Sequence, residues 1–127
     1  MATEPKSDFL LISTRLLTIL RKYAHGNLSI RTDKPGQYEL TGPPTPRSRG
    51  KEMWLGAVRI GKRYVSYHIM TVYAFPDLLN GISPELKKRM QGKSCFNFTH
   101  VDEKLFHELD KLTELGFERF KKEGFTG

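Results

Sequence analysis

His68 is the residue of this chain whose surroundings come nearest to a catalytic or binding pattern. Tyr64 and Ser66 stand at alternate positions before it in the segment YVSYH. An imidazole titrates near neutral pH, so it can act as a general acid or base or bind a ligand, and hydroxyl groups beside it could assist. A lone histidine in a strand is more often a hydrogen-bonded structural residue. Because neither a second ligand nor an orienting carboxylate accompanies His68, we favour the structural role.

The other histidines and the single cysteine do not complete a site. Neither the spacing from His100 to His107 nor that from His68 to His100 matches a metal-binding signature. Cys95 lies in the segment SCFNF, where a free cysteine typically packs as a small apolar side chain, and one cysteine excludes an internal disulfide. We therefore predict no catalytic residue, no metal site and no cofactor, and favour a non-enzymatic protein over an enzyme that uses His68.

Positive charge is concentrated in the first half of the chain. The net charge is +7, and residues 9–63 hold eleven Lys and Arg but only three Asp and Glu, whereas residues 64–127 hold nine of each. We call Arg47, Arg49, Lys51 and Arg63 the basic patch, and two further bases, Arg59 and Lys62, stand close to them in the sequence. Such a surface could meet nucleic acid, but at this modest net charge we favour a solvated surface that maintains solubility.

A long β-hairpin is predicted for residues 53–73, MWLGAVRIGKRYVSYHIMTVY, because two runs rich in β-branched and aromatic residues meet at Gly61-Lys62. If Gly61-Lys62 is a two-residue turn, an apolar face pairs Ile60 with Arg63, Val58 with Val65, Gly56 with Tyr67 and Trp54 with Ile69. This face should lie under helices. The opposite, open face then pairs Arg59 with Tyr64, Ala57 with Ser66 and Leu55 with His68, followed by Met70.

The remaining elements surround this hairpin. Apolar residues at three- and four-residue steps predict a first helix from Asp8 to His25 and a last helix from Val101 to Phe120. Further segments are read as strands at 28–31, 37–41 and 94–98 and as a short helix beginning after Ser83. Residues 1–6 read as a disordered polar tail. Residues 42–50, GPPTPRSRG, read as an exposed, mobile loop because they contain no apolar side chain.

These elements predict a single α+β domain over residues 1–127. No crossover helix separates the first four strands, so we expect a mostly antiparallel sheet of about five strands with the N- and C-terminal helices packed on one face. No apolar run approaches the ~20 residues of a bilayer span. We expect a cytoplasmic protein without a membrane partner.

The order of hairpin, short helix ending in Gly, strand and C-terminal amphipathic helix resembles the YdhG-like family of small bacterial domains. The resemblance rests on MWLGAVRIGKRYVSYHIM, on ISPELKKRMQGKSCFNF and on the closing helix. It implies a frataxin-like fold and, from some members of the family, an iron-chaperone role. Frataxin-type iron binding relies on carboxylates along the first helix, but no Asp or Glu lies between Phe9 and His25 here. Iron delivery is therefore a less favoured function.

The function that we expect is binding. The exposed sheet face, with the 42–50 loop beside it, would hold a small anionic ligand or a protein partner. The candidate ligand-binding residues are Arg59, Lys62, Tyr64, Ser66, His68 and Met70, with the basic patch close by. Nucleic-acid association through that patch is the alternative, and nothing in the residues decides the oligomeric state.

Overall fold

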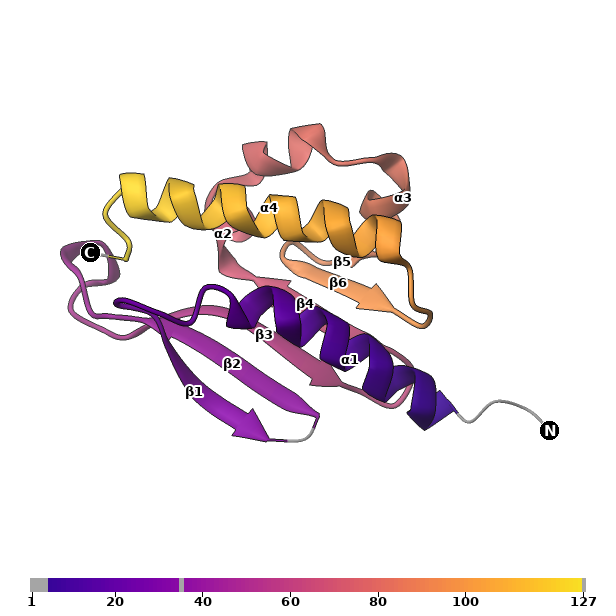
Figure 1. Ribbon diagram of the computed structural model, residues 1–127. Helices are drawn as coiled ribbons and strands as arrows, with labels where there is room; N and C mark the ends of the chain where they lie inside the picture. Colours follow the sequence, from indigo (N-terminus) through magenta and orange to yellow (C-terminus); the bar gives the residue numbers. More distant parts are fainter. Residues whose placement is uncertain (1–4, 35, 127) are drawn as a thin grey trace.

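The computed structural model describes residues 5–34 and 36–126, with the backbone alone for residues 5–7. The predicted α+β architecture is confirmed: a six-stranded antiparallel sheet carries helices from the two ends of the chain (Figure 1). The strand order is β1-β2-β3-β4-β6-β5. The strands are β1 (Ser29–Lys34), β2 (Gln37–Gly42), β3 (Met53–Ile60), β4 (Val65–Ile69), β5 (Met90–Gln91) and β6 (Cys95–Phe98).

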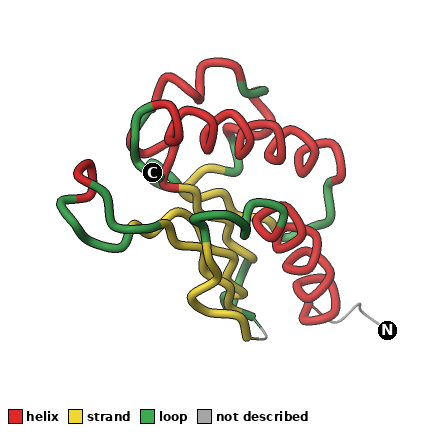
Figure 2. Tube along the Cα trace, turned by 60° about the vertical axis from the view of Figure 1, so that its left-hand side comes forward, coloured by secondary structure: helices red, strands yellow, loops and turns green. Residues whose placement is uncertain are grey.

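Two long and several short helices complete the fold. The α-helices are α1 (Pro5–Arg21), α2 (Met70–Ala74), α3 (Pro84–Lys87) and α4 (Glu103–Lys122), and the 3-10 turns are η1 (Pro46–Ser48) and η2 (Pro76–Gly81). Helix α1 begins at Pro5, inside the predicted tail of residues 1–6, and the first four residues of that tail lie outside the described residues. Figure 2 shows the long helices on one side of the strands and the η1 loop extending from the end of the sheet.

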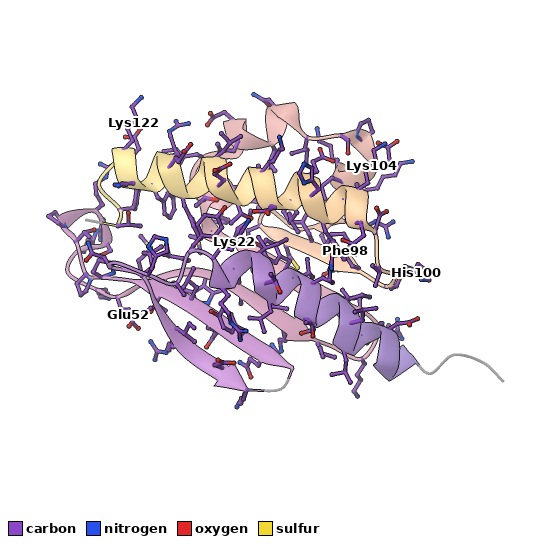
Figure 3. All side chains as sticks on the ribbon, in the orientation of Figure 1. Lys22, Glu52, Phe98, His100, Lys104 and Lys122 are labelled. Carbon is purple, nitrogen blue, oxygen red and sulfur yellow. The ribbon has the colours of Figure 1, made fainter. Side chains whose placement is uncertain are left out.

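Helices α1 and α4 run side by side in the same direction over the sheet. Each buries an apolar stripe, which includes Ile12, Leu16 and Leu20 on α1 and Leu109, Leu112 and Phe120 on α4. Their facing edges carry opposite charges, because Arg15 pairs with Glu103 and the Lys22 ammonium lies 2.5 Å from the Asp110 carboxylate. Lys22 stands beside α4 at the C-terminal end of α1 (Figure 3). The basic first helix is therefore partly matched by acids of the last one.

The hairpin of β3 and β4 forms with a longer connection than predicted. Ile60 pairs with Val65 and Val58 with Tyr67, so Gly61 to Tyr64 make a four-residue loop in which the Gly61 N–H donates to the Tyr64 carbonyl at 2.9 Å. The predicted two-residue turn was therefore wrong, and the predicted pairing of Ile60 with Arg63 is shifted by two residues. Side chains alternate between faces with period two, so an even slip leaves Val58, Val65 and Tyr67 on the buried face as predicted.

A β-bulge changes the first residues of β3. The pairing with β2 passes from Leu40 with Gly56 to Thr41 with Trp54, so Leu55 has no partner there. The extra residue reverses the alternation, and Leu55 is fully buried in the core. The Trp54 ring instead lies 6.0 Å from the His68 ring, on the face that the helices leave open. The predicted directions of Trp54 and Leu55 were therefore wrong.

The predicted second strand also ends early. β4 stops at Ile69, and the next residues form α2, which buries Thr71 and Val72. Helix α2 approaches α4 closely at Gly116, where an added Cβ would lie 2.7 Å from the Thr71 Cβ. Met70 consequently packs against the core as part of a helix and does not belong to the sheet face, contrary to prediction.

Segment 42–50 contains a hydrogen-bonded turn. The Thr45 and Ser48 side chains each accept from the backbone N–H of the other residue, and Thr45 is buried. The Arg47 guanidinium lies 4.9 Å from the centre of the Phe125 ring. These contacts connect the segment to the C-terminal end of the chain, and its mobility stays a prediction.

Candidate binding face of the sheet

The face of the sheet opposite α1 and α4 presents two rows of cross-strand neighbours. In one row Ala57 lies opposite His68, and His68 opposite Cys95. In the next row Arg59 lies opposite Ser66, and Ser66 opposite Asn97. We call the six residues of these rows, together with Trp54 and Gln91, the open face. They alternate along the strands with apolar core residues. Ala57 and Ser66 among them are themselves buried, whereas Arg59 and Gln91 are exposed.

The polar groups at the centre of the open face bond to one another. The Ser66 hydroxyl donates to Asn97 Oδ1 at 2.9 Å, and the Asn97 amide donates to Gln91 Oε1 at 2.6 Å. The Cys95 thiol lies 3.2 Å from the same Asn97 oxygen and 3.5 Å from His68 Nε2. Mutual hydrogen bonds order these side chains into a preformed centre that contains no Asp, Glu, Lys or Arg. Charges lie beside this centre, at Arg59 and at Glu39 of β2, which pairs with Ala57.

Both titratable groups of this network are held in their uncharged forms. Burial, with a further contribution from the Arg59 guanidinium, lowers the pKa of His68. Burial raises the pKa of the Cys95 thiol, against a smaller opposing effect of Ser66. A cysteine nucleophile needs a thiolate, which a lowered thiol pKa and a protonated imidazole would favour. Here the thiol pKa is raised and the imidazole pKa is lowered, each opposite to what an activated thiolate requires. The Cys95–His68 contact therefore lacks the electrostatics of an activated nucleophile.

The structure brings together some of the predicted site residues and separates others. Arg59, Ser66 and His68 lie on the open face, as predicted. Lys62 and Tyr64 belong to the connecting loop at the end of the hairpin, and Met70 belongs to α2.

Sequence reasoning missed Trp54, Gln91, Cys95 and Asn97. Alternation in the segment CFNF was a usable signal, because Phe96 and Phe98 are buried and the residues between them must point outward. Cys95 is accordingly half-buried on the outer face, where the prediction had a buried apolar side chain.

The basic patch does not form one surface. Arg47, Arg49 and Lys51 precede the first residue of β3, whereas Lys62 and Arg63 follow its last residue. Eight residues of extended strand separate the two groups, a length of about 26 Å. Sequence proximity therefore overstated the local density of positive charge.

Metal-ligating side chains do not converge in the described part of the chain: no group of three or more His, Cys, Asp or Glu is placed to hold an ion. None of the helices within residues 5–34 and 36–126 has the length and apolar composition of a membrane span.

Two hollows open on other parts of the surface. One, of about 470 Å³, lies between the loop after α1 and the C-terminal half of α4. The other, of about 220 Å³, lies beside α3 and the start of α4. No residue of the open face lines either of them, so the open face is not a wall of these hollows.

Comparisons of the chain with protein-family models, with curated proteins and with solved structures gave no match. The resemblance to the YdhG-like family and its implied iron-chaperone role therefore stay predictions.

Proposed function

We propose that the protein is a non-enzymatic binding module that receives a protein partner on the open face. The observation that carries the proposal is the arrangement of this face. A neutral, internally hydrogen-bonded centre formed by Ser66, His68 and Asn97 is flanked by Trp54 and by the exposed Arg59. Interface centres are depleted in charged residues, and Trp and Arg are enriched among the residues that dominate binding energy.

Two observations support a protein partner over a small anionic ligand. Small-molecule sites are concave, and neither described hollow includes a residue of the open face. Arg59 is the one cation in the two rows of neighbours. A partner with an acidic residue opposite Arg59 would satisfy it, while a small anion would gain a single charged contact.

The geometry gives less support to the other candidate functions. Nucleic-acid association would have to engage two groups of bases at opposite ends of β3, and Arg31, near the first group in space, already pairs with Glu52. An enzyme that uses His68 with Cys95 would have to reverse the direction of both pKa shifts.

The test compares variants of the open face with a matched charge reversal on the helical side. Proteins retained by the immobilised wild-type chain are identified, purified and titrated against Trp54→Ala, Arg59→Glu and Lys104→Glu. Lys104 is an exposed residue of α4 (Figure 3). We expect the first two variants to weaken binding by about tenfold or more, because truncation at interface hot spots costs at least about 2 kcal/mol. Lys104→Glu should leave the affinity within about twofold.

Equal affinity of all the variants for the recovered partner would contradict the proposal, as would failure to retain any protein that the Trp54→Ala/Arg59→Glu double variant loses. Binding of an oligonucleotide that weakens steeply with salt would instead support nucleic-acid association.

A further inference from the structure

The larger hollow lies on the helical side of the molecule, away from the open face. It is formed by the turn that follows α1, residues 23–28, and by the C-terminal half of α4. Its volume of about 470 Å³ falls in the range of about 300–1,000 Å³ that is typical of sites for small molecules. The hollow is therefore large enough for a compact organic ligand.

Aromatic side chains form the apolar part of its lining. The Tyr23 and Phe117 rings meet edge to face with their centroids 4.9 Å apart, and Leu28 lies beside them. The Asn27 amide donates to the Thr126 carbonyl at 3.3 Å, which joins the turn after α1 to the C-terminal segment at the edge of the hollow. An apolar body of a ligand would find a preformed surface on the two rings.

Two carboxylates, Glu114 and Glu118, line the hollow from successive turns of α4. Neither forms an ion pair within the described part of the chain, although Lys121 and His25 also line the hollow. The pKa of Tyr23 is raised far above its ordinary value, first by burial and then by the nearby carboxylates of Asp110, Glu114 and Glu118. The two carboxylates of the lining thus outnumber its one ammonium group, that of Lys121, in a chain whose net charge is +7.

We propose that this hollow binds an organic monoamine, that is, an ammonium group attached to an aromatic or alkyl body. The ammonium contacts the Glu114 and Glu118 carboxylates, and the body packs against the Tyr23 and Phe117 rings. Aromatic faces also attract a cation held nearby, which adds to the attraction of the carboxylates. Lys121 lines the same hollow, and the Lys22 ammonium already lies 5.8 Å from the centre of the Tyr23 ring. These two cations oppose further positive charge, so a monoamine fits better than a polyamine.

The probe for this site is phenethylamine, with 2-phenylethanol and 3-phenylpropionate as neutral and anionic analogues of similar size. Binding is followed by chemical-shift changes of the backbone amides of Gly26, Asn27 and Leu28, which lie at the hollow. We expect the amine to bind about tenfold more tightly than the alcohol, and the carboxylate to bind least, because the amine alone carries a positive charge that pairs with the glutamates.

Variants separate the proposed contact from general charge effects. The double variant Glu114→Gln/Glu118→Gln should lower the affinity for phenethylamine about tenfold, toward that of the alcohol. Glu85→Gln is the matched control, because Glu85 is an exposed glutamate of α3 that lines the smaller hollow. It should leave the affinity within about twofold.

Three results would overturn the proposal: equal affinity for the amine and the alcohol, unchanged affinity of the double glutamine variant, or no shift of the named amides at millimolar phenethylamine. Since no residue of the open face takes part, each result leaves the proposed protein-binding function to its own test.

Discussion

At the scale of single residues, His68 shows how a histidine that resembles a catalytic group in the sequence can belong to a hydrogen-bonded network on one face of a sheet. Its Nε2 lies 3.5 Å from the Cys95 sulfur, and its ring lies beside Trp54. The lowered pKa follows first from burial and then from Arg59. These surroundings stabilise the neutral imidazole, so the folded protein takes up a proton at His68 less readily than the unfolded chain.

The predicted consequence is a loss of stability in acid that depends on His68. Because the folded-state pKa is below the unfolded value of 6.5, the contribution of His68 to the free energy of unfolding is fully present above that pH. It is lost as the pH falls below 6.5 toward the folded-state pKa. His68→Gln, which cannot be protonated, should remove this part of the pH dependence in denaturant-unfolding experiments at a series of pH values.

His107→Gln provides the control, because His107 is exposed on α4. We expect it to leave the acid limb of the stability profile unchanged. An NMR titration of the His68 ring should give a pKa below the ordinary 6.5. Superimposable stability profiles of wild type and His68→Gln would refute the prediction.

At the scale of elements, the close contact between α2 and α4 depends on a glycine, which has no side chain. Gly116 is buried in the middle of α4, and a Cβ at this position would lie 2.7 Å from the Thr71 Cβ of α2. Cβ atoms essentially never approach so closely, so any larger residue must displace α2. The position of α2, which replaces the end of the predicted strand, therefore requires a glycine more than forty positions later in the sequence.

Gly116→Ala should lower the free energy of unfolding by about 1–3 kcal/mol, the usual cost of overpacking. Helix propensity alone would favour Ala over Gly by about 1 kcal/mol, so a net loss isolates the steric contact. Gly81→Ala is the matched control, because nothing lies within 4 Å of a Cβ added at Gly81. The control should change stability by less than about 0.5 kcal/mol, and a Gly116→Ala variant as stable as wild type would contradict the predicted clash.

The hairpin shows which features of an element can be read from its own residues. Alternation correctly placed Val58, Val65 and Tyr67 in the core and Arg59, Ser66 and His68 on the opposite face of the sheet. It failed at Trp54 and Leu55, because the bulge that exchanges their faces arises in the pairing with β2. A pattern within one strand carries no information about an extra residue relative to its neighbour.

At the scale of the whole molecule, the C-terminal segment connects parts of the chain that are distant in sequence. The Phe125 ring stacks on Phe120 with centroids 4.6 Å apart and meets Phe75 edge to face at 5.8 Å. The Arg47 guanidinium lies 4.9 Å from the centre of the Phe125 ring, and the Asn27 amide donates to the backbone carbonyl of the next residue, Thr126. The segment thus contacts the loops after α1, β2 and α2.

Phe125→Ala should lower the free energy of unfolding by about 1–2 kcal/mol, because a half-buried phenyl ring loses part of its buried apolar area. It should also speed hydrogen exchange of the amides of residues 48–51, since the turn at η1 loses the contact through Arg47. Thr126→Ala is the matched control, because Asn27 bonds the backbone carbonyl of that residue. Exchange rates in the η1 turn that do not respond to Phe125→Ala would show that the ring does not hold this turn.

The distribution of the basic residues over the surface also depends on the whole fold. The bases of the first half of the chain have different partners and positions. Arg15 and Lys22 face acids of α4, and Arg21 and Arg31 pair with Asp33 and Glu52. Other bases stand before and after β3, namely Arg47, Arg49, Lys51, Lys62 and Arg63. A net charge of +7 therefore does not correspond to a single basic surface. The hollow that carries Glu114 and Glu118 has locally the opposite sign.

The sequence by itself determined the fold class, the antiparallel hairpin at its centre, the two long helices and most of the inward-facing residues. These features depend on periodicities of two and 3.6 residues, which each segment expresses on its own. Only the tertiary structure decided the four-residue hairpin loop, the bulge at Leu55, the change from strand to helix at Met70, the joining of Cys95 and Asn97 to His68, and the hollow beside α4. Each of these depends on contacts between segments far apart in the chain, which local patterns do not encode.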